Sequence, residues 1–300
     1  MISVGVDLSG LKVGAVINTS SGGCDADSEA EMRHIFKSAG VTNYKTWCGE
    51  SHQMERAFAE AATEKPKMLA VLGGDGTIRT AAEACTGTDT SLLPLPGGTL
   101  NMLPRALYGD MSWQEALKST LAAPSRKPLS AGRTGDALFF VAAIVGAPGL
   151  WMEARESLRE RELGDAVEKS AVALRAIFET KIRYSISPGV RGEADVLAVV
   201  CPLVSEEMSD SEEALEAAAI DVENAGELFR LATATAFGRW RDDETVTLTK
   251  TRKVTVQSNK DIPVFLDGER VPASKNADIT FVAHAVNVIV PKPNHLGKEF

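Results

Sequence analysis

Short apolar runs alternate with amphipathic segments over the first 123 residues of this 300-residue chain, and this alternation is the strongest constraint on its fold. Runs typical of buried strands lie at residues 13–17, 41–47, 68–72 and 91–95. Segments with helical spacing of apolar residues lie at 28–39, 53–64, 78–85, 100–107 and 113–122. Such alternation is typical of a parallel sheet, which binds ligands beyond the carboxyl ends of its strands. We therefore predict an α/β domain over residues 1–124.

The pattern changes after residues 123–128, whose two prolines indicate a linker. Short segments in which polar and apolar residues alternate then predict an antiparallel sheet. They lie at 137–145, 181–187, 195–201, 228–235, 245–249, 253–257 and 279–290. A helix is predicted to end near 178, and the acidic segment 206–216 is predicted to be a solvated loop. We assign residues 125–300 to a second, antiparallel β domain, whose last residues return to the first.

Charge and cysteine content exclude several classes of protein. The 41 acidic residues outnumber the 32 Lys and Arg residues, and a net charge of −9 gives no electrostatic reason to bind nucleic acid. No apolar stretch reaches the roughly 20 residues of a membrane span, and no signal peptide is recognisable. The four cysteines and four histidines show no metal-ligand spacing. These features predict a cytoplasmic protein without a zinc site or disulfides.

The most informative local motif is a glycine-rich turn at residues 73–77, Gly-Gly-Asp-Gly-Thr, which directly follows an apolar run. Glycines allow the backbone to approach a ligand closely, and N–H groups at the start of a helix suit a polyphosphate. Asp75 would repel phosphate unless a magnesium ion bridged the two groups. The alternative is a tight strand-to-helix turn with Asp75 as the helix N-cap. The residues alone do not decide between these interpretations.

Two further turns of the same kind follow predicted strands. One is residues 96–101, Pro-Gly-Gly-Thr-Leu-Asn, and the other is residues 18–22, Asn-Thr-Ser-Ser-Gly. Because parallel strands end at one edge of their sheet, the three turns are expected to face one crevice, which favours a nucleotide site. The chain contains neither a Walker-type P-loop nor the Gly-x-Gly-x-x-Gly dinucleotide fingerprint. A hydride-transfer enzyme built on that fingerprint is therefore disfavoured.

In this order, the motifs resemble the diacylglycerol kinase catalytic-domain family, which includes sphingosine and ceramide kinases and soluble bacterial lipid kinases. The turn at 73–77 matches the family's GGDGT signature, and residues 18–22 and 96–101 are similar to its flanking loops. Residues 132–140 are similar to the family's G-R-x-x-G-x-x-F-F segment, and residues 267–269 match a late Asp-Gly-Glu motif. The resemblance covers nearly the whole chain.

The resemblance implies a phosphofructokinase- or NAD kinase-like α/β domain, a β-sandwich domain that binds lipid, and transfer of the γ-phosphoryl group of ATP to a lipid hydroxyl such as that of diacylglycerol. It implies Mg2+ as a second cofactor, held by Asp75. The residues that would line the ATP site are Asn18, Ser21, Gly73, Gly74, Asp75, Gly76, Thr77, Gly98, Thr99 and Asn101. Glu269 matches the family's general base. Without the resemblance, residues 267–269 are most simply a hairpin turn.

Departures from the family pattern keep two alternatives open. Thr80 stands where members usually have Glu, Met102 where they usually have Asp, and Thr19 where they have Pro. A catalytically weakened lipid-binding or regulatory homologue is therefore one alternative. An NAD kinase-like enzyme is the other, although the loop at 96–101 and the motif at 267–269 argue against it.

The expected partners follow from the same resemblance and from the charge of the chain. We expect a lipid substrate, no nucleic acid, and transient contact with a membrane surface through an apolar rim rather than a basic patch. Members of the family often form a homodimer, although no interface is recognisable in this sequence.

Overall fold

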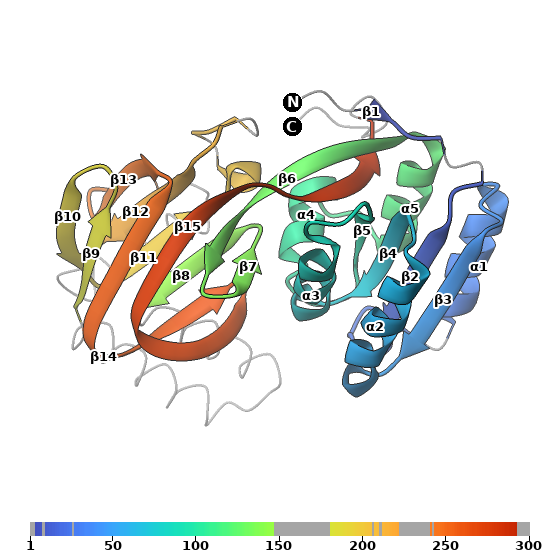
Figure 1. Ribbon diagram of the computed structural model, residues 1–300, viewed down its shortest axis with the longest axis horizontal. Helices are drawn as coiled ribbons and strands as arrows, with labels where there is room; N and C mark the ends of the chain where they lie inside the picture. The colour runs from blue at the N-terminus through green and yellow to red at the C-terminus, as the bar shows by residue number, and fades with distance from the viewer. Residues whose placement is uncertain are drawn as a thin grey trace. The chain divides into compact units, whose positions relative to one another are not determined.

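The computed structural model describes residues 4–7, 10–25, 27–146, 181–205, 207–209, 212–221, 241 and 243–292 (Figure 1). The chain divides into two compact units, Met1–Ser130 with Ala283–Phe300 and Ala131–Val282. The helix predicted to end near 178 and the strand predicted at 228–235 lie outside the described residues. Within the described ranges, no helix has the length and apolar character needed to cross a membrane.

The first unit is built around a parallel sheet. Its elements are β1 (Val4–Gly5), β2 (Val13–Asn18), α1 (Ser28–Ser38), β3 (Tyr44–Gly49), η1 (Ser51–Gln53), α2 (Met54–Glu64), β4 (Met68–Gly73), α3 (Asp75–Cys85), β5 (Ser91–Pro96), α4 (Met102–Tyr108), α5 (Trp113–Ala122) and β6 (Pro124–Thr134). The parallel strands lie in the order β3–β2–β4–β5. The last part of β15 (Glu269–Pro291) pairs with β5 in parallel, at Val288 and Leu92.

Burial explains why these segments form strands and helices. Every residue of β2 and β4 is buried, as expected for parallel strands with both faces covered. In α1, the buried side chains Met32, Ile35 and Phe36 recur at helical spacing. The predicted alternation of strands and helices is confirmed. The boundaries differ at β3, which was predicted at 41–47 and spans Tyr44–Gly49.

The order of the strands determines where a ligand can bind. From β2 the chain passes through α1 to β3 on one side, and then through α2 to β4 on the other side of β2. The topological switch point therefore lies between β2 and β4, and in open α/β sheets ligands bind at the carboxyl ends of the strands at such a point. The turns at 18–22 and 73–77 begin there.

The second unit contains antiparallel strands, as predicted. Its elements are β7 (Ala137–Phe139), β8 (Ala142–Gly146), β9 (Ile182–Ile186), β10 (Val190–Ala194), β11 (Val196–Val200), η2 (Pro202–Val204), β12 (Leu215–Ile220), β13 (Val246–Thr251), β14 (Lys253–Leu266) and most of β15. The strand order is β13–β12–β11–β8–β14–β15, and β9 pairs with both β10 and β14. Its core consists of aliphatic side chains, nearly all from these strands, together with Phe139 and Cys201.

Three details of the sequence-based assignment were wrong. The linker predicted at 123–128 is largely strand, because β6 begins at Pro124 and pairs with β1. The strand predicted at 137–145 is two strands, interrupted at Phe140–Val141. Glu216 was placed in a solvated loop, but it is 1% exposed in β12 and pairs with Arg241, with Nε and Oε1 2.7 Å apart. Because Arg241 lies 25 residues away in the sequence, the run of acidic residues itself did not indicate that Glu216 is buried in an ion pair.

Candidate functional site

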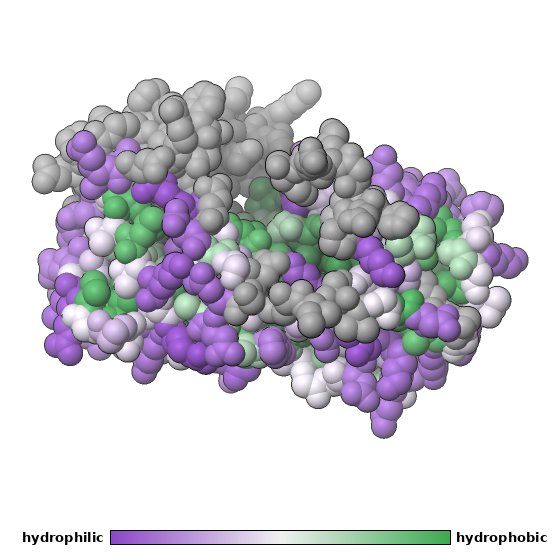
Figure 2. Space-filling view, turned by 90° about the horizontal axis from the view of Figure 1, so that it is seen from above, coloured by the Kyte–Doolittle hydropathy of each residue, from purple (hydrophilic) through white to green (hydrophobic). Residues whose placement is uncertain are grey.

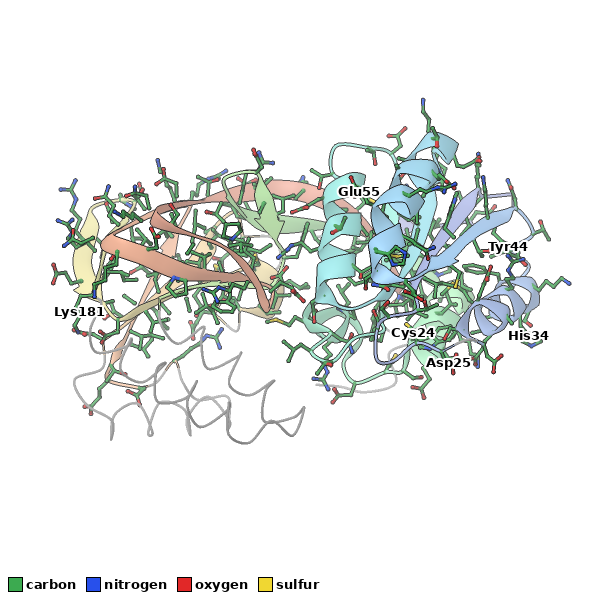
Figure 3. All side chains as sticks on the ribbon, turned by 90° about the horizontal axis from the view of Figure 1, so that it is seen from below. Cys24, Asp25, His34, Tyr44, Glu55 and Lys181 are labelled. Carbon is green, nitrogen blue, oxygen red and sulfur yellow. The ribbon has the colours of Figure 1, made fainter. Side chains whose placement is uncertain are left out.

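The three glycine-containing turns meet at the carboxyl edge of the parallel sheet. The N–H of Gly23 donates to the carbonyl of Gly97 at 2.8 Å, and the N–H of Gly97 donates to the carbonyl of Gly73 at 3.0 Å. The hydroxyl of Ser21 accepts the N–H of Gly74 at 3.0 Å. Figure 3 labels Cys24 and Asp25, on the loop that leads from the first turn into α1. The convergence of the turns that was expected from the strand order is therefore present.

Asn18 connects the end of β2 to the first turn of α3. Its side chain is 5% exposed, and its Nδ2 donates to Thr77 Oγ1 at 2.9 Å and to Ser51 Oγ at 3.3 Å. Ser51 was not predicted, because no motif surrounds it. It lies just after β3, at the same carboxyl edge, and that position was the one signal in the sequence that could have identified it.

Packing between the turns requires the two glycines of the third turn, Gly97 and Gly98. A Cβ atom added at Gly97 would lie 2.8 Å from the backbone nitrogen of Gly73, and one at Gly98 would lie 2.6 Å from Gly74 Cα. A Cβ at Gly73 would lie 2.7 Å from the side chain of Thr77. These contacts are too short for any side chain. Gly97 and Gly98 therefore let the third turn pack against the second, and Gly73 leaves room for Thr77 within the second turn.

Gly74 is different. A Cβ added there would meet no described atom closer than Gly98 Cα, at 3.7 Å, which is an ordinary contact. Its backbone is extended, with φ −79° and ψ 178°, a conformation open to any residue. Neither packing among the described residues nor backbone strain explains the glycine. The missing side chain instead leaves space at the N-terminus of α3, where the first N–H groups have no partner within the helix and suit a phosphate.

Asp75 links the second turn to the third. It is 9% exposed, and its Oδ2 accepts the N–H of Asn101 at 2.9 Å while its Oδ1 accepts the N–H of Met102 at 2.6 Å. A carboxylate at the start of α4 satisfies N–H groups that have no partner within the helix and interacts favourably with the helix dipole. Gly74, not Asp75, is the N-cap of α3. Asp75, the first residue of α3, therefore caps the start of α4.

Asn101 stabilises the third turn itself. Its side chain accepts the N–H of Gly98 at 2.7 Å and donates to the carbonyl of the same residue at 2.8 Å. Its backbone is left-handed, with φ 49°, so its side chain faces its own turn and the capping of α4 is left to Asp75. Thr99, at the tip of this turn, is exposed, and Gly76 lies in the first turn of α3.

The arrangement around Asp75 bears on magnesium binding. Each carboxylate oxygen already accepts a backbone N–H, and the described residues include no group of three or more His, Cys, Asp or Glu side chains placed to hold a metal. Mg2+ commonly binds one or two carboxylates together with phosphates and water. The described residues thus do not form a metal cage of their own, and the assignment of Asp75 as a metal ligand stays a prediction.

The late Asp-Gly-Glu motif forms the hairpin between β14 and β15 in the second unit. Leu266 pairs with Glu269, and Asp267 and Gly268 both have positive φ, 48° and 85°. This is the pattern of a two-residue hairpin turn, so that interpretation is confirmed. Asp267 is buried, whereas Glu269 is exposed. The role of Glu269 as a general base stays a prediction.

Comparison with known proteins agrees with the motifs. Residues 12–132, which include all three turns, match the family model of the diacylglycerol kinase catalytic domain. Over these residues the chain is similar to members of that family. The resemblance inferred from residues 73–77 is therefore confirmed.

Individual relatives extend the comparison. A Pseudomonas putida protein named "Probable lipid kinase YegS-like" is 36% identical over 103 residues, which is 34% of each chain, so the match spans about a third of that relative. The crystal structure of a diacylglycerol kinase from Bacillus anthracis is similar over 94% of this chain and 97% of its own, with 15% identity and a TM-score of 0.68. Another structure from the same organism gives 17% identity, a TM-score of 0.72 and coverage of 94% and 96%. These structures confirm the fold.

The two kinds of glycine in the three turns should respond differently to alanine. Gly74→Ala should leave the unfolding temperature unchanged within experimental error, because the Cβ atom meets only ordinary contacts, but should weaken ATP binding by filling the space in front of α3. Gly98→Ala should destabilise the protein by about 1–3 kcal/mol, because its Cβ atom overlaps Gly74. Thermal unfolding and calorimetric ATP titration of both variants measure the difference. Normal ATP affinity of Gly74→Ala would contradict this assignment of the site.

Nucleotide binding without metal distinguishes the two roles considered for Asp75. In Asp75→Asn the amide can accept only one of the two N–H groups, so the start of α4 loses part of its cap. If Asp75 acts as this cap, the variant should bind ATP more weakly both with Mg2+ and with EDTA, and should be destabilised by about 1–3 kcal/mol. A loss of affinity confined to the Mg2+ titration, with unchanged stability, would instead identify a metal ligand.

Proposed function

We propose that this protein is an ATP-dependent lipid kinase, which transfers the γ-phosphoryl group to the hydroxyl of a lipid such as diacylglycerol. The observation that carries the proposal is the hydrogen-bonded assembly of the turns at 18–22, 73–77 and 96–101 at the switch point of a diacylglycerol kinase catalytic domain. The likeness to a protein named as a lipid kinase supports the choice of a lipid acceptor.

The residues of the first unit would bind and orient the triphosphate. The start of α3 would receive the phosphates, with Gly74 allowing close approach and Ser21 fixing the Gly74 N–H. Asn18 would hold Thr77 in place, and Asp75 would keep the third turn against the second. ATP supplies the phosphoryl group. Phosphate oxygens, water and a carboxylate, for which Asp75 is the predicted residue, would hold Mg2+, and the ion would offset charge on the phosphates.

Glu269 is the proposed general base for the acceptor. A lipid hydroxyl must lose its proton as its oxygen attacks phosphorus, and a carboxylate within hydrogen-bonding distance can take that proton. Glu269 is exposed at the first position of β15, whereas its neighbour Asp267 is buried and engaged with backbone N–H groups. Asp267 thus stabilises the backbone, and the exposed carboxylate of Glu269 is the one proposed to meet the acceptor hydroxyl.

Contact with the lipid phase is proposed to be transient. On the face shown in Figure 2, hydrophilic residues are interspersed with hydrophobic patches. Among the described residues, the exposed large apolar residue is Leu248, with 36% of its surface accessible. A chain with a net charge of −9 is not attracted to anionic lipid as a whole, which favours brief apolar contact over stable binding.

A regulatory homologue without turnover is the second candidate. It is favoured by Thr80 and Met102, which stand where the family pattern usually has acidic residues. The hydroxyl of Thr80 donates to the carbonyl of Gly76 within α3, and the contact of Met102 with Asp75 uses its backbone N–H. Neither side chain supplies a carboxylate that could hold a metal.

Incubation with labelled ATP and Mg2+ separates these functions. Purified protein would be tested against mixed micelles of diacylglycerol, a sphingoid base or ceramide, and in parallel against NAD. A lipid kinase should label at least one lipid and leave NAD unlabelled. Labelled NAD would instead indicate the NAD kinase-like alternative, and ATP binding without transfer to any acceptor would indicate the regulatory homologue.

Loss of the proposed base should affect rate rather than nucleotide affinity. Glu269→Gln should lower kcat for the lipid acceptor roughly 10²–10⁴-fold, the usual contribution of a general base, and leave the Kd for ATP unchanged. The exposed Glu55→Gln on α2 serves as a matched control and should keep full activity. Full activity of Glu269→Gln would mean that the motif is only a hairpin turn.

A further inference from the structure

The hairpin turn that carries Glu269 is anchored by Asp267, two residues earlier. The Asp267 side chain is 4% exposed and accepts three backbone N–H groups. Its Oδ2 accepts from Phe140 at 2.7 Å, and its Oδ1 accepts from Val141 at 2.8 Å and Ala142 at 3.0 Å. The N–H of Asp267 also donates to the carbonyl of Ala142 at 2.9 Å. The turn is therefore attached to the segment between β7 and β8 by both backbone and side chain.

The interruption between β7 and β8 explains why a carboxylate is needed there. β7 ends at Phe139 and β8 begins at Ala142, so the N–H groups of Phe140 and Val141 fall between the two strands. Both residues are buried, and a buried N–H without a partner is costly. Asp267 supplies the acceptor for both. A neutral side chain of the same size would offer fewer lone pairs and would direct an N–H₂ group at N–H donors.

The same contacts determine the position of Glu269. The last paired residues before the turn are Leu266 with Glu269 across the hairpin, and Leu266 with Ala143 of β8 on its other side. Asp267 has a positive φ, which is less favoured for a residue other than glycine, and the three hydrogen bonds of its carboxylate hold it in that conformation. A change in the turn would shift the first residue of β15, which is Glu269.

We propose that Asp267 is a positioning residue that holds Glu269 in its productive place, and that it takes no proton itself. This inference rests on the proposed function. The three N–H donors stabilise the ionised carboxylate of Asp267 and occupy it, so the exposed carboxylate of Glu269 is left to meet the acceptor hydroxyl. Burial and the nearby negative charge of Asp267 together raise the pKa of the Cys201 thiol.

A double-mutant cycle tests the proposal. Asp267→Asn should lower kcat for lipid phosphorylation by about tenfold or more while KM for ATP changes less than about twofold, and in a Glu269→Gln background the same change should lower kcat less than about twofold. Asp261→Asn is the matched control, because Asp261 is an exposed carboxylate on the same strand, β14, and should leave kcat unchanged. Wild-type kcat in a folded Asp267→Asn, or an equal loss in both backgrounds, would overturn the positioning role.

Gly268→Ala is a second variant for the case in which Asp267→Asn does not fold. It keeps the carboxylate but forces a side chain into a backbone with φ 85°, so it should displace Glu269 and lower kcat with the same dependence on Glu269. If Gly268→Ala folds and retains the kcat of the wild type, the position of Glu269 does not depend on this turn and the proposal is overturned.

Amide hydrogen exchange keeps this inference separate from the proposed function. If the wild-type protein phosphorylates no lipid, the proposed function fails, and exchange in Asp267→Asn still tests the anchor. Faster exchange at residues 140–142 that extends to Glu269 would support it. Unchanged protection at Glu269 would overturn it.

Discussion

The hydrogen bonds from the Asn101 and Met102 N–H groups to the Asp75 carboxylate are the contact on which the candidate site depends. They join the turn after β4 to the start of α4, and the close packing of the turn glycines requires that these two segments stay together. Hydrogen bonds to a charged group stabilise a fold by about 1.5–3 kcal/mol each, and these two are largely shielded from water. An acidic residue in a turn suited to phosphate is compatible with that function because backbone N–H groups already offset its charge.

Asp75 and Asp267 follow the same physical principle in two separate units. Each belongs to a motif that resembles one of the family, each is buried, and each carboxylate accepts backbone N–H groups at a point where regular structure begins or breaks. Buried charges are costly unless they are paired, and here backbone N–H groups donate hydrogen bonds to both carboxylates. The aspartates of both motifs thus organise the backbone in this chain, and Glu269 differs from them by being exposed.

The sequence was sufficient for features that depend on local pattern. The fully buried strands β2 and β4 read as continuous apolar runs, and the turns after them were visible as glycines and hydroxyl residues. Features that depend on distant partners were not predictable. Asp75 pairs with N–H groups 26 and 27 residues away, next to a left-handed backbone at Asn101, and no local residue pattern specifies either feature. The polar first part of β15 likewise gave no strand signal, because much of it is exposed.

The departures from the family pattern have different structural consequences. Met102 replaces an acidic residue, yet it contacts Asp75 through its backbone N–H, so the geometry of the third turn is preserved whatever side chain is present. Thr80 replaces another acidic residue on the exposed side of α3, where its hydroxyl bonds within the helix. Neither change disturbs the hydrogen bonds that join the turns. The two changes therefore leave the hydrogen-bonded assembly of the turns intact and remove two carboxylates that a metal could have used.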